Sequence, residues 1–305
     1  MKKIVLLLFN LNILTVCIGQ EIVLIGKMED SKTAQPLLYA TIEIFSLKTG
    51  TITDSDGNFD LRIIPQDINR DTILFSHVGY NKKYMSVNDF IHSGKVIVLE
   101  EMPVMLGEIN VTPKKYTTLI LGVKENQPSS LQYANVFGAN KGNFIKNDRQ
   151  KAGWIKSVSY YIHPDGNSRT PFRVRIYGVD ESQTPVQDIL NKSVVVSANG
   201  PGWVKADLSE YHIPFPEEGV FITMEWINSG VDFYFEKEVA VKGKDGKPET
   251  VKRKYYGQSL GTVWKKGEAA MWGGTLGNEW IPYNFSNKGK YINAMIQAEV
   301  IYEEK

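Results

Sequence analysis

The sequence has 305 residues, of which 42% are hydrophobic, 23% charged and 11% aromatic. This composition is typical of folded proteins and excludes a mostly disordered chain, while the length allows one large domain or two ordinary ones. Basic and acidic residues number 35 and 34, so the formal net charge of +1 excludes the overall basic field of many nucleic-acid-binding proteins. The single cysteine excludes an internal disulfide and any multi-cysteine metal cluster.

Residues 1–19 have the layout of a secretory signal peptide: a short positive start, an apolar run and small side chains before Gln20. The apolar run is shorter than the ~20 residues that span a bilayer, which favours a cleaved leader over a retained anchor. Cys17 leaves a second reading open, in which this cysteine carries a lipid, although Val16 is larger than the residue usually found before a lipidated cysteine. We therefore predict an exported protein.

Short strand patterns broken by Gly, Pro, Asn and Asp follow the leader. In residues 41–44 the side chains alternate with period two, which places one face of that strand inside and the other outside. One short helical turn is expected over residues 87–91. The strands expected before residue 113 are Glu21–Lys27, Ala40–Phe45, Asn58–Ile64, Thr72–Ser76 and Lys95–Leu99.

Several blocks of this region occur in the order of a known family. They are Ile25-Gly26-Lys27, Gln35–Ile44 (QPLLYATIEI), Gly50–Phe59 (GTITDSDGNF), Ile73–Tyr80 (ILFSHVGY) and Leu106–Pro113 (LGEINVTP). With these blocks, residues 22–113 resemble the carboxypeptidase regulatory-like domain, a seven-stranded, transthyretin-like β-sandwich. The resemblance implies an accessory domain of the kind found at the N-termini of exported envelope proteins, including some TonB-dependent receptors.

The family name does not imply a peptidase here. None of the four histidines, His77, His92, His163 and His212, is followed three residues later by the glutamate of the peptidase zinc motif. The residues after position 113 are also too few for the plug and large barrel of a TonB-dependent receptor. We therefore expect no enzyme activity, no metal site and no cofactor.

The rest of the chain divides into two parts. Residues 114–150 are rich in Asn, Lys and Gly, and we expect an irregular linker and entry segment there. From 151 to 305 short strand patterns resume, which predicts an all-β protein whose second domain is a jelly-roll-like antiparallel sandwich. Residues 185–190 are the one helical turn expected in it. The segments Gly153–Ile155, Pro171–Tyr177 and Gly202–Leu208 resemble galactose-binding-type jelly rolls, a likeness of fold that implies no function by itself.

All six tryptophans lie in this second part of the chain. Exposed aromatic rings stack on the apolar faces of sugars, so a glycan platform is one interpretation. Its candidate residues are Trp264, Trp272, Trp280 and Tyr283. The other interpretation is packing between the sheets, which we favour strongly for Trp203 and Trp226 and also favour for Trp272 and Trp280.

Residues 237–266 carry nine basic and three acidic side chains, a local excess of +6. Residues 244–248 have the pattern of the tip of a protruding hairpin, with Val239, Val241 and Val251 along its arms. One interpretation is contact with anionic lipid, lipopolysaccharide or an acidic polymer. The favoured one is a solvated hairpin whose lysines discourage edge pairing. The candidate contact residues are Lys242, Lys244, Lys247, Lys252, Arg253 and Lys254.

These observations predict a non-enzymatic, exported envelope protein that acts as a binding or scaffolding module through protein–protein contacts. The predicted location is the periplasm, or the outer membrane or cell surface, of a Gram-negative type bacterium, with peripheral membrane contact as an option. The predicted partner is another envelope protein. The alternative is a carbohydrate-binding protein that uses exposed tryptophans of its C-terminal sandwich, and the least favoured one is a hydrolase accessory or a glycoside hydrolase.

Overall fold

The computed structural model describes residues 21–65, 67, 69–102, 115–229, 234–243, 246–267 and 270–304. The expected leader, the expected closing strand at 106–113 and Lys244 therefore lie outside the described residues. The described residues form two β-sandwiches with three short helical segments, α1 (Val87–His92), η1 (Phe45–Leu47) and η2 (Ser209–Tyr211). None of the described helices is long and apolar enough to cross a membrane.

The N-terminal sandwich, residues 21–102, consists of two sheets with the strand orders β4-β1-β7 and β3-β2-β5-β6. Its strands are β1 (Ile22–Asp30), β2 (Thr41–Ile44), β3 (Thr49–Ile52), β4 (Asn58–Ile63), β5 (Thr72–Ser76), β6 (Lys83–Ser86) and β7 (Val96–Leu99). These seven strands of the described region confirm the expected sandwich. The rings of Phe59, Phe75 and Phe90 meet in its core, with centroids 5.9–6.1 Å apart. The expected helical turn is α1, whose first turn is capped where Asp89 N donates to Ser86 Oγ over 2.9 Å.

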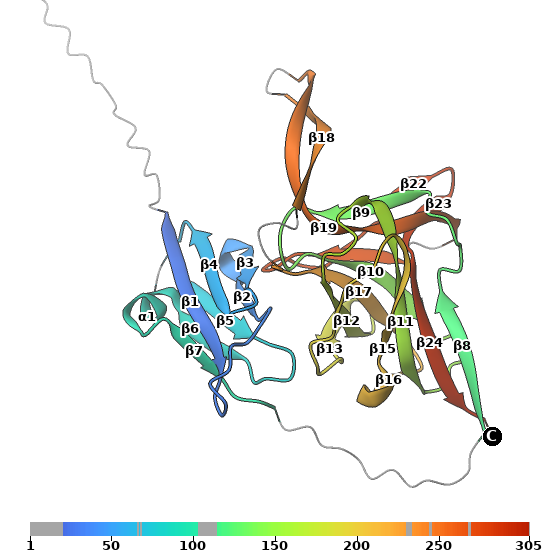
Figure 1. The fold of residues 1–305 in the computed structure, drawn as a ribbon, viewed down its shortest axis with the longest axis horizontal. Coiled ribbons are helices and arrows are strands. Elements are labelled where there is room, and N and C mark those ends of the chain that lie inside the picture. The colour runs from blue at the N-terminus through green and yellow to red at the C-terminus, as the bar shows by residue number, and fades with distance from the viewer. Residues whose placement is uncertain are drawn as a thin grey trace, which may run out of the picture.

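The C-terminal sandwich, residues 115–304, has a core of apolar side chains between two antiparallel sheets (Figure 1). One sheet has the order β13-β12-β17-β10-β20-β21, and the other has the order β22-β23-β19-β11-β24-β8. The strands are β8 (Tyr116–Gly122), β9 (Ser130–Ala134), β10 (Asn140–Lys146), β11 (Gly153–Gly166), β12 (Phe172–Val179), β13 (Pro185–Asp188), β14 (Val195–Val196), β15 (Gly202–Asp207), β16 (Ile213–Phe215), β17 (Gly219–Trp226), β18 (Tyr234–Lys242), β19 (Pro248–Lys266), β20 (Met271–Gly274), β21 (Ile281–Pro282), β22 (Ser286–Asn287), β23 (Lys290–Ala294) and β24 (Ile296–Glu303).

The expectation of irregular structure over residues 114–150 was wrong, because the described part of this segment contains β8, β9 and β10. β10 lies between β17 and β20 in the middle of a sheet. Its Asn143, a poor strand former, is held there because its side-chain amide exchanges two hydrogen bonds with the backbone of Ala294, at 2.6 and 2.9 Å. Because its oxygen and its nitrogen are both hydrogen-bonded, burying this side-chain amide costs little free energy.

The helical turn expected at residues 185–190 was also wrong. Residues 185–188 form β13, which pairs with β12. The turn between these strands is set by Asp180, whose side chain accepts hydrogen bonds from the backbone N–H groups of Ser182 and Thr184. These hydrogen bonds fix a tight turn, after which the chain reverses direction and continues as a strand beside β12.

All eight residues of β17 are buried, so the sheet that contains it is covered on both faces. Val220, Ile222, Met224 and Trp226 pack into the core between the sheets. The alternate residues point to the other side, which we call the outer face. It is formed by Asn140 of β10, by Arg173, Arg175 and Tyr177 of β12, and by Phe221, Thr223 and Glu225 of β17.

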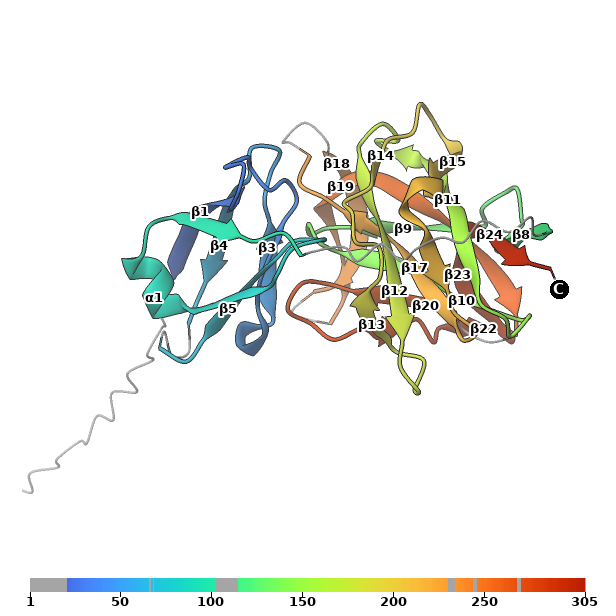
Figure 2. The ribbon, with the colours of Figure 1, turned by 90° about the horizontal axis from the view of Figure 1, so that it is seen from below.

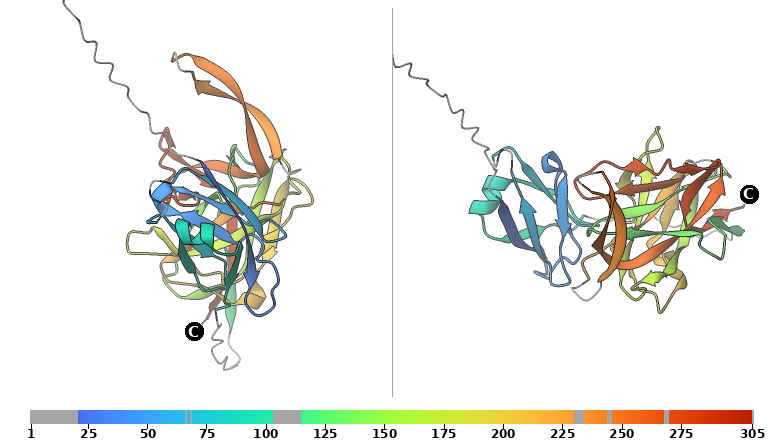
Figure 3. Two further views of the ribbon diagram at one scale, coloured as in Figure 1. Left: turned by 90° about the vertical axis from the view of Figure 1, so that its left-hand side faces the viewer. Right: turned by 90° about the horizontal axis from the view of Figure 1, so that it is seen from above.

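The hairpin expected near residue 245 is an antiparallel ribbon of β18 and the first half of β19, which we call the arm. It stands out from the body of the C-terminal sandwich (Figures 1 and 3). Its strands pair in register from Tyr234 opposite Tyr256 to Lys242 opposite Pro248, with Val239 opposite Val251.

We expect the substitution Phe75→Ala to lower the free energy of unfolding by about 3–5 kcal/mol, because it opens a cavity among three packed rings. The substitution Tyr84→Ala is the matched control, since that ring lies on the surface of the same sandwich. Urea unfolding followed by circular dichroism measures both. Equal losses for the two variants would contradict the packing described for this core.

Candidate binding cleft between the two sandwiches

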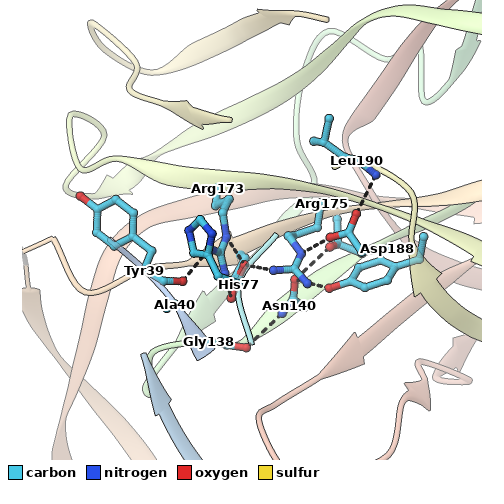
Figure 4. Close-up of polar contacts among 12 residues, drawn as sticks. Tyr39, Ala40, His77, Gly138, Asn140, Arg173, Arg175, Asp188 and Leu190 are labelled. Atoms are coloured by element: carbon cyan, nitrogen blue, oxygen red, sulfur yellow. Dashed lines mark hydrogen bonds and ion pairs between the residues drawn. The ribbon is translucent and has the colours of Figure 1, made fainter. Parts of the chain in front are cut away.

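The N-terminal sandwich packs against the outer face of the C-terminal sandwich, at the opposite side of the molecule from β8 and the C-terminus (Figures 1 and 2). The central contact is made by Arg173 of β12, whose side chain is only 1% exposed. Its Nε and Nη2 atoms donate to the two carboxylate oxygens of Glu225, over 2.7 and 2.9 Å. Its Nη1 atom donates to the carbonyl oxygen of Tyr39 in the N-terminal sandwich, over 2.6 Å (Figure 4).

A second contact is made by the loop between β20 and β21, which lies against the β2–β3 hairpin. Gly277 N donates to Glu43 Oε1 over 2.9 Å, and Asn278 Nδ2 donates to the carbonyl oxygen of Lys48 over 3.2 Å. A Cβ atom on Gly277 would lie 2.6 Å from backbone atoms of Thr49, so only glycine allows the two backbones this close. Main-chain atoms of the two sandwiches are therefore in direct contact here.

The charged side chains beneath this contact form a closed network. Arg175 Nε lies 2.5 Å from Asp188 Oδ2, and Arg175 Nη1 lies 3.3 Å from Glu225 Oε2. Burial alone would raise the pKa of Glu225, but Arg173 and Arg175 outweigh it and hold this pKa below its usual range. At Asp188 burial outweighs the single close arginine and raises the pKa. Two guanidinium groups thus balance two carboxyl groups.

His77 lies at the edge of the network, in the N-terminal sandwich. Its Nε2 atom is 3.1 Å from the carbonyl oxygen of Leu38, and its ring meets Tyr80 edge-on at 5.1 Å. Burial, together with the positive charge of Arg173, lowers the pKa of His77 to about 4. His77 is therefore neutral at pH 7.

A cleft of about 1220 Å³ opens beside these contacts, with walls from both sandwiches. The N-terminal wall includes Glu43, Lys48, His77, Tyr80 and Lys82, and the C-terminal wall includes Asn140, Arg175, Tyr177, Gln187, Asp188, Asn191, Glu225, Asn278, Glu279 and Trp280. The Trp280 ring contacts Tyr177 edge-on at 5.0 Å and lies over Gly274, which has no side chain to displace it. The cleft therefore combines an aromatic wall with a floor of paired charges.

The structure separates the four aromatic residues suggested as a glycan platform. Trp280 lines the cleft, and Trp272 lies on the outer face against Phe221, with ring centroids 5.5 Å apart. Trp264 and Tyr283 pack against the core of the C-terminal sandwich instead. Only Trp272 and Trp280 share one face, and their role in binding stays a prediction.

Of the basic residues suggested for contact with an anionic surface, Lys244 lies outside the described residues and the others lie on the arm. Lys254 stands opposite Glu236 and Lys252 opposite Glu238 in the register, so part of the positive charge faces a carboxylate directly. The ammonium group of Lys254 also lies 3.6 Å from the ring centroid of Tyr234. Contact of Lys242, Lys247 and Arg253 with an anionic surface stays a prediction.

The charged network of the outer face was missed by the sequence reasoning. Arg173 and Arg175 alternate with apolar residues, as solvent-facing residues of a half-buried strand do. A signal was present at Glu225, a single carboxylate within the apolar run of residues 220–227. A carboxylate in a strand that is apolar on both sides requires a buried cationic partner. Among the described residues, no group of three or more His, Cys, Asp or Glu side chains is placed to hold a metal ion.

Comparison with known proteins matches residues 24–111 to the model of the CarboxypepD_reg-like domain family. The TonB-dependent receptor SusC of Bacteroides thetaiotaomicron is 26% identical over 245 residues, which cover 76% of this chain and 22% of the receptor. The chain thus spans about a fifth of the length of that relative. Among solved structures, BcpA, the major pilin subunit of Bacillus cereus, aligns with 94% of this chain and 88% of its own, at 12% identity and a TM-score of 0.18. That score is too low to indicate a shared fold.

We expect the substitution Arg173→Met to lower the free energy of unfolding by about 3–5 kcal/mol, because it leaves the buried carboxylate of Glu225 with only one of its two arginine partners. The control is Lys205→Met, which removes a surface ion pair with Glu299 and should cost at most about 1 kcal/mol. Urea unfolding at neutral pH measures both variants. A cost for Arg173→Met as small as that of the control would show that the buried pair does not hold the structure.

Stability should also fall as the pH drops from the usual pKa of His77, 6.5, to about 4. In this window the unfolded chain binds a proton on His77 that the folded protein does not bind, so acid favours unfolding. The substitution His77→Gln should flatten the pH dependence of the unfolding free energy between these values. The exposed His92→Gln is the control and should follow the parent protein, and a parent-like slope for His77→Gln would contradict the buried neutral state.

Proposed function

Residues 24–111 form a carboxypeptidase regulatory-like domain, and from this premise we propose that the protein is a non-enzymatic, exported envelope module that works through protein–protein contacts. Its proposed location is the periplasm, or the outer membrane or cell surface, of a Gram-negative type bacterium. The match to a TonB-dependent receptor supports the envelope assignment. The second sandwich supports a scaffolding role, because it holds the first in one fitted orientation at Arg173.

The observation that carries this proposal is an apolar patch on the N-terminal sandwich. Val23 and Ile25 of β1 and Val96 and Val98 of β7 point outward from the three-stranded sheet, and Ile25 is 52% exposed. β7 is thus apolar on both faces, although it lies at the edge of its sheet. In the register Val96 lies opposite Lys27 and Val98 opposite Glu29, so exposed β-branched side chains alternate with charged ones on this face. An edge strand with such exposed apolar side chains favours a surface that another protein covers.

Carbohydrate binding is the second candidate. Trp272 and Trp280 support it, since they lie on the same face of one sheet and Trp280 lines the cleft. Trp264 and Tyr283 no longer support it, because they pack against the core.

A hydrolase gains no support from the cleft. Asp188 and Glu225 are its most buried carboxyl groups, and both are paired with arginine. A general acid needs a proton to give at working pH, and Arg173 and Arg175 hold the pKa of Glu225 below its usual range, which favours its ionised form. Burial raises the pKa of Asp188, but its carboxyl group lies 2.5 Å from Arg175 Nε and accepts a hydrogen bond from Leu190 N, so contacts within the protein already hold it.

The double substitution Ile25→Asp, Val98→Asp should abolish the capture of a partner from an envelope extract, because charges replace two of the four exposed apolar side chains of this face. The control is Val195→Asp, which changes an exposed valine of the C-terminal sandwich and should leave capture unchanged. Pull-down with chemical cross-linking, compared by mass spectrometry, measures the difference. Capture of the same proteins at the same yield by all three forms would contradict the proposed surface.

A further inference from the structure

We infer that the cleft between the two sandwiches binds a neutral saccharide chain, with Trp280 as its stacking surface and polar groups from both sandwiches on its walls. This inference rests on carbohydrate binding, the second proposed function. It adds where the site lies, that the ligand is uncharged and that both domains contribute binding groups.

The size of the cleft fits a chain rather than a single ring. Its volume of about 1220 Å³ exceeds the ~300–1,000 Å³ of ordinary small-molecule sites. Its walls come from two separate sandwiches, so it is a cleft between two surfaces rather than a cavity enclosed by one. A ligand of several linked rings uses such a space better than a metabolite does.

The charges around the cleft are balanced in number, which favours a neutral ligand over a strongly ionic one. The lining cations Lys48, Lys82 and Arg175 face four lining carboxyl groups, those of Glu43, Asp188, Glu225 and Glu279. Arg173, beneath the floor, supplies the fourth positive charge through its pair with Glu225. The buried charges are those of Arg173, Arg175, Asp188 and Glu225, which pair with one another. An ionic ligand that reaches these groups would have to break a pair and leave a buried charge without its partner. A neutral ligand meets no such cost.

The polar groups that remain accessible suit hydroxyls. Gln187 is exposed on the C-terminal wall and Asn191 is half-buried there, and side-chain amides donate and accept at once. Trp280 is only partly buried, which leaves ring surface for the C–H face of a sugar. The two amides and the aromatic ring together can serve the hydroxyl groups and the apolar face of a saccharide.

Both sandwiches contribute to the walls, so a bound ligand should contact both of them and hold them together. Glu43 and Lys82 belong to the N-terminal sandwich, whereas Gln187 and Trp280 belong to the C-terminal one. A ligand that contacts both binds only the docked arrangement and therefore stabilises it. The inference thus predicts a rise in unfolding temperature with saccharide, as well as binding.

The test uses the full chain and neutral hexasaccharides of glucose, mannose, galactose and xylose as probes, with oligogalacturonate as the charged counterpart of galactan. Binding is measured by calorimetry and by the shift of the unfolding temperature. The variants are Trp280→Ala, which alters the cleft wall, and Trp272→Ala, which removes the same kind of side chain from the same face outside the cleft. Lys82→Ala tests the wall of the N-terminal sandwich, and circular dichroism checks that each variant is folded.

At least one neutral hexasaccharide should bind, and Trp280→Ala should weaken it by about tenfold or more while Trp272→Ala changes it by no more than about twofold. Lys82→Ala should weaken the same probe by a smaller factor, and oligogalacturonate should bind no better than neutral galactan. Binding that survives Trp280→Ala, or that is lost equally in Trp272→Ala, would overturn the assigned site while leaving carbohydrate binding intact. Tighter binding of oligogalacturonate would overturn the neutral-ligand assignment. No binding of any probe would overturn both the inference and the second proposed function.

Discussion

The guanidinium of Arg173 is buried between two β-sandwiches and makes its hydrogen bonds to both of them. Two go to Glu225 within its own sheet and one goes to the carbonyl oxygen of Tyr39, which lies 134 positions earlier in the sequence. Burying a guanidinium is costly unless nearly every N–H finds an acceptor. Because one acceptor comes from the other sandwich, each of the three guanidinium nitrogens of Arg173 has an acceptor only when the two are docked in this orientation.

Such a pair specifies geometry more than it adds stability. A buried ion pair often contributes little net free energy, since desolvation offsets the attraction of the charges. Its value here is that alternative arrangements of the sandwiches would leave Nη1 of Arg173 without its acceptor, the carbonyl oxygen of Tyr39. The glycine contacts act in the same direction, because at Gly277 and Gly50 a Cβ atom would collide with the neighbouring sandwich. The walls of the cleft come from both sandwiches, so the same contacts set the separation of these walls.

Much of the fold was predictable from local patterns, and much of the site was not. Alternating side chains and the family blocks indicated the N-terminal sandwich, and Val239 and Val251 indicated the arm. The strand β10 escaped prediction because Asn143 is stabilised by the distant Ala294, which no local pattern contains. The burial of Arg173 was not predicted for the same reason. A strand with one polar face is expected to expose that face to solvent, and here the polar face is buried only because the other sandwich packs against it.

The central claim is that Arg173 fixes the two sandwiches in one orientation, and distances between spin labels test it most directly. Labels on cysteines introduced at the exposed Tyr84 and Val195 report on the N-terminal and C-terminal sandwiches. Pulsed electron resonance should give one narrow distance distribution for the otherwise unaltered protein and a broad one when Arg173 is replaced by methionine. A broad distribution in the unaltered protein, or the same narrow distribution in both, would contradict the account.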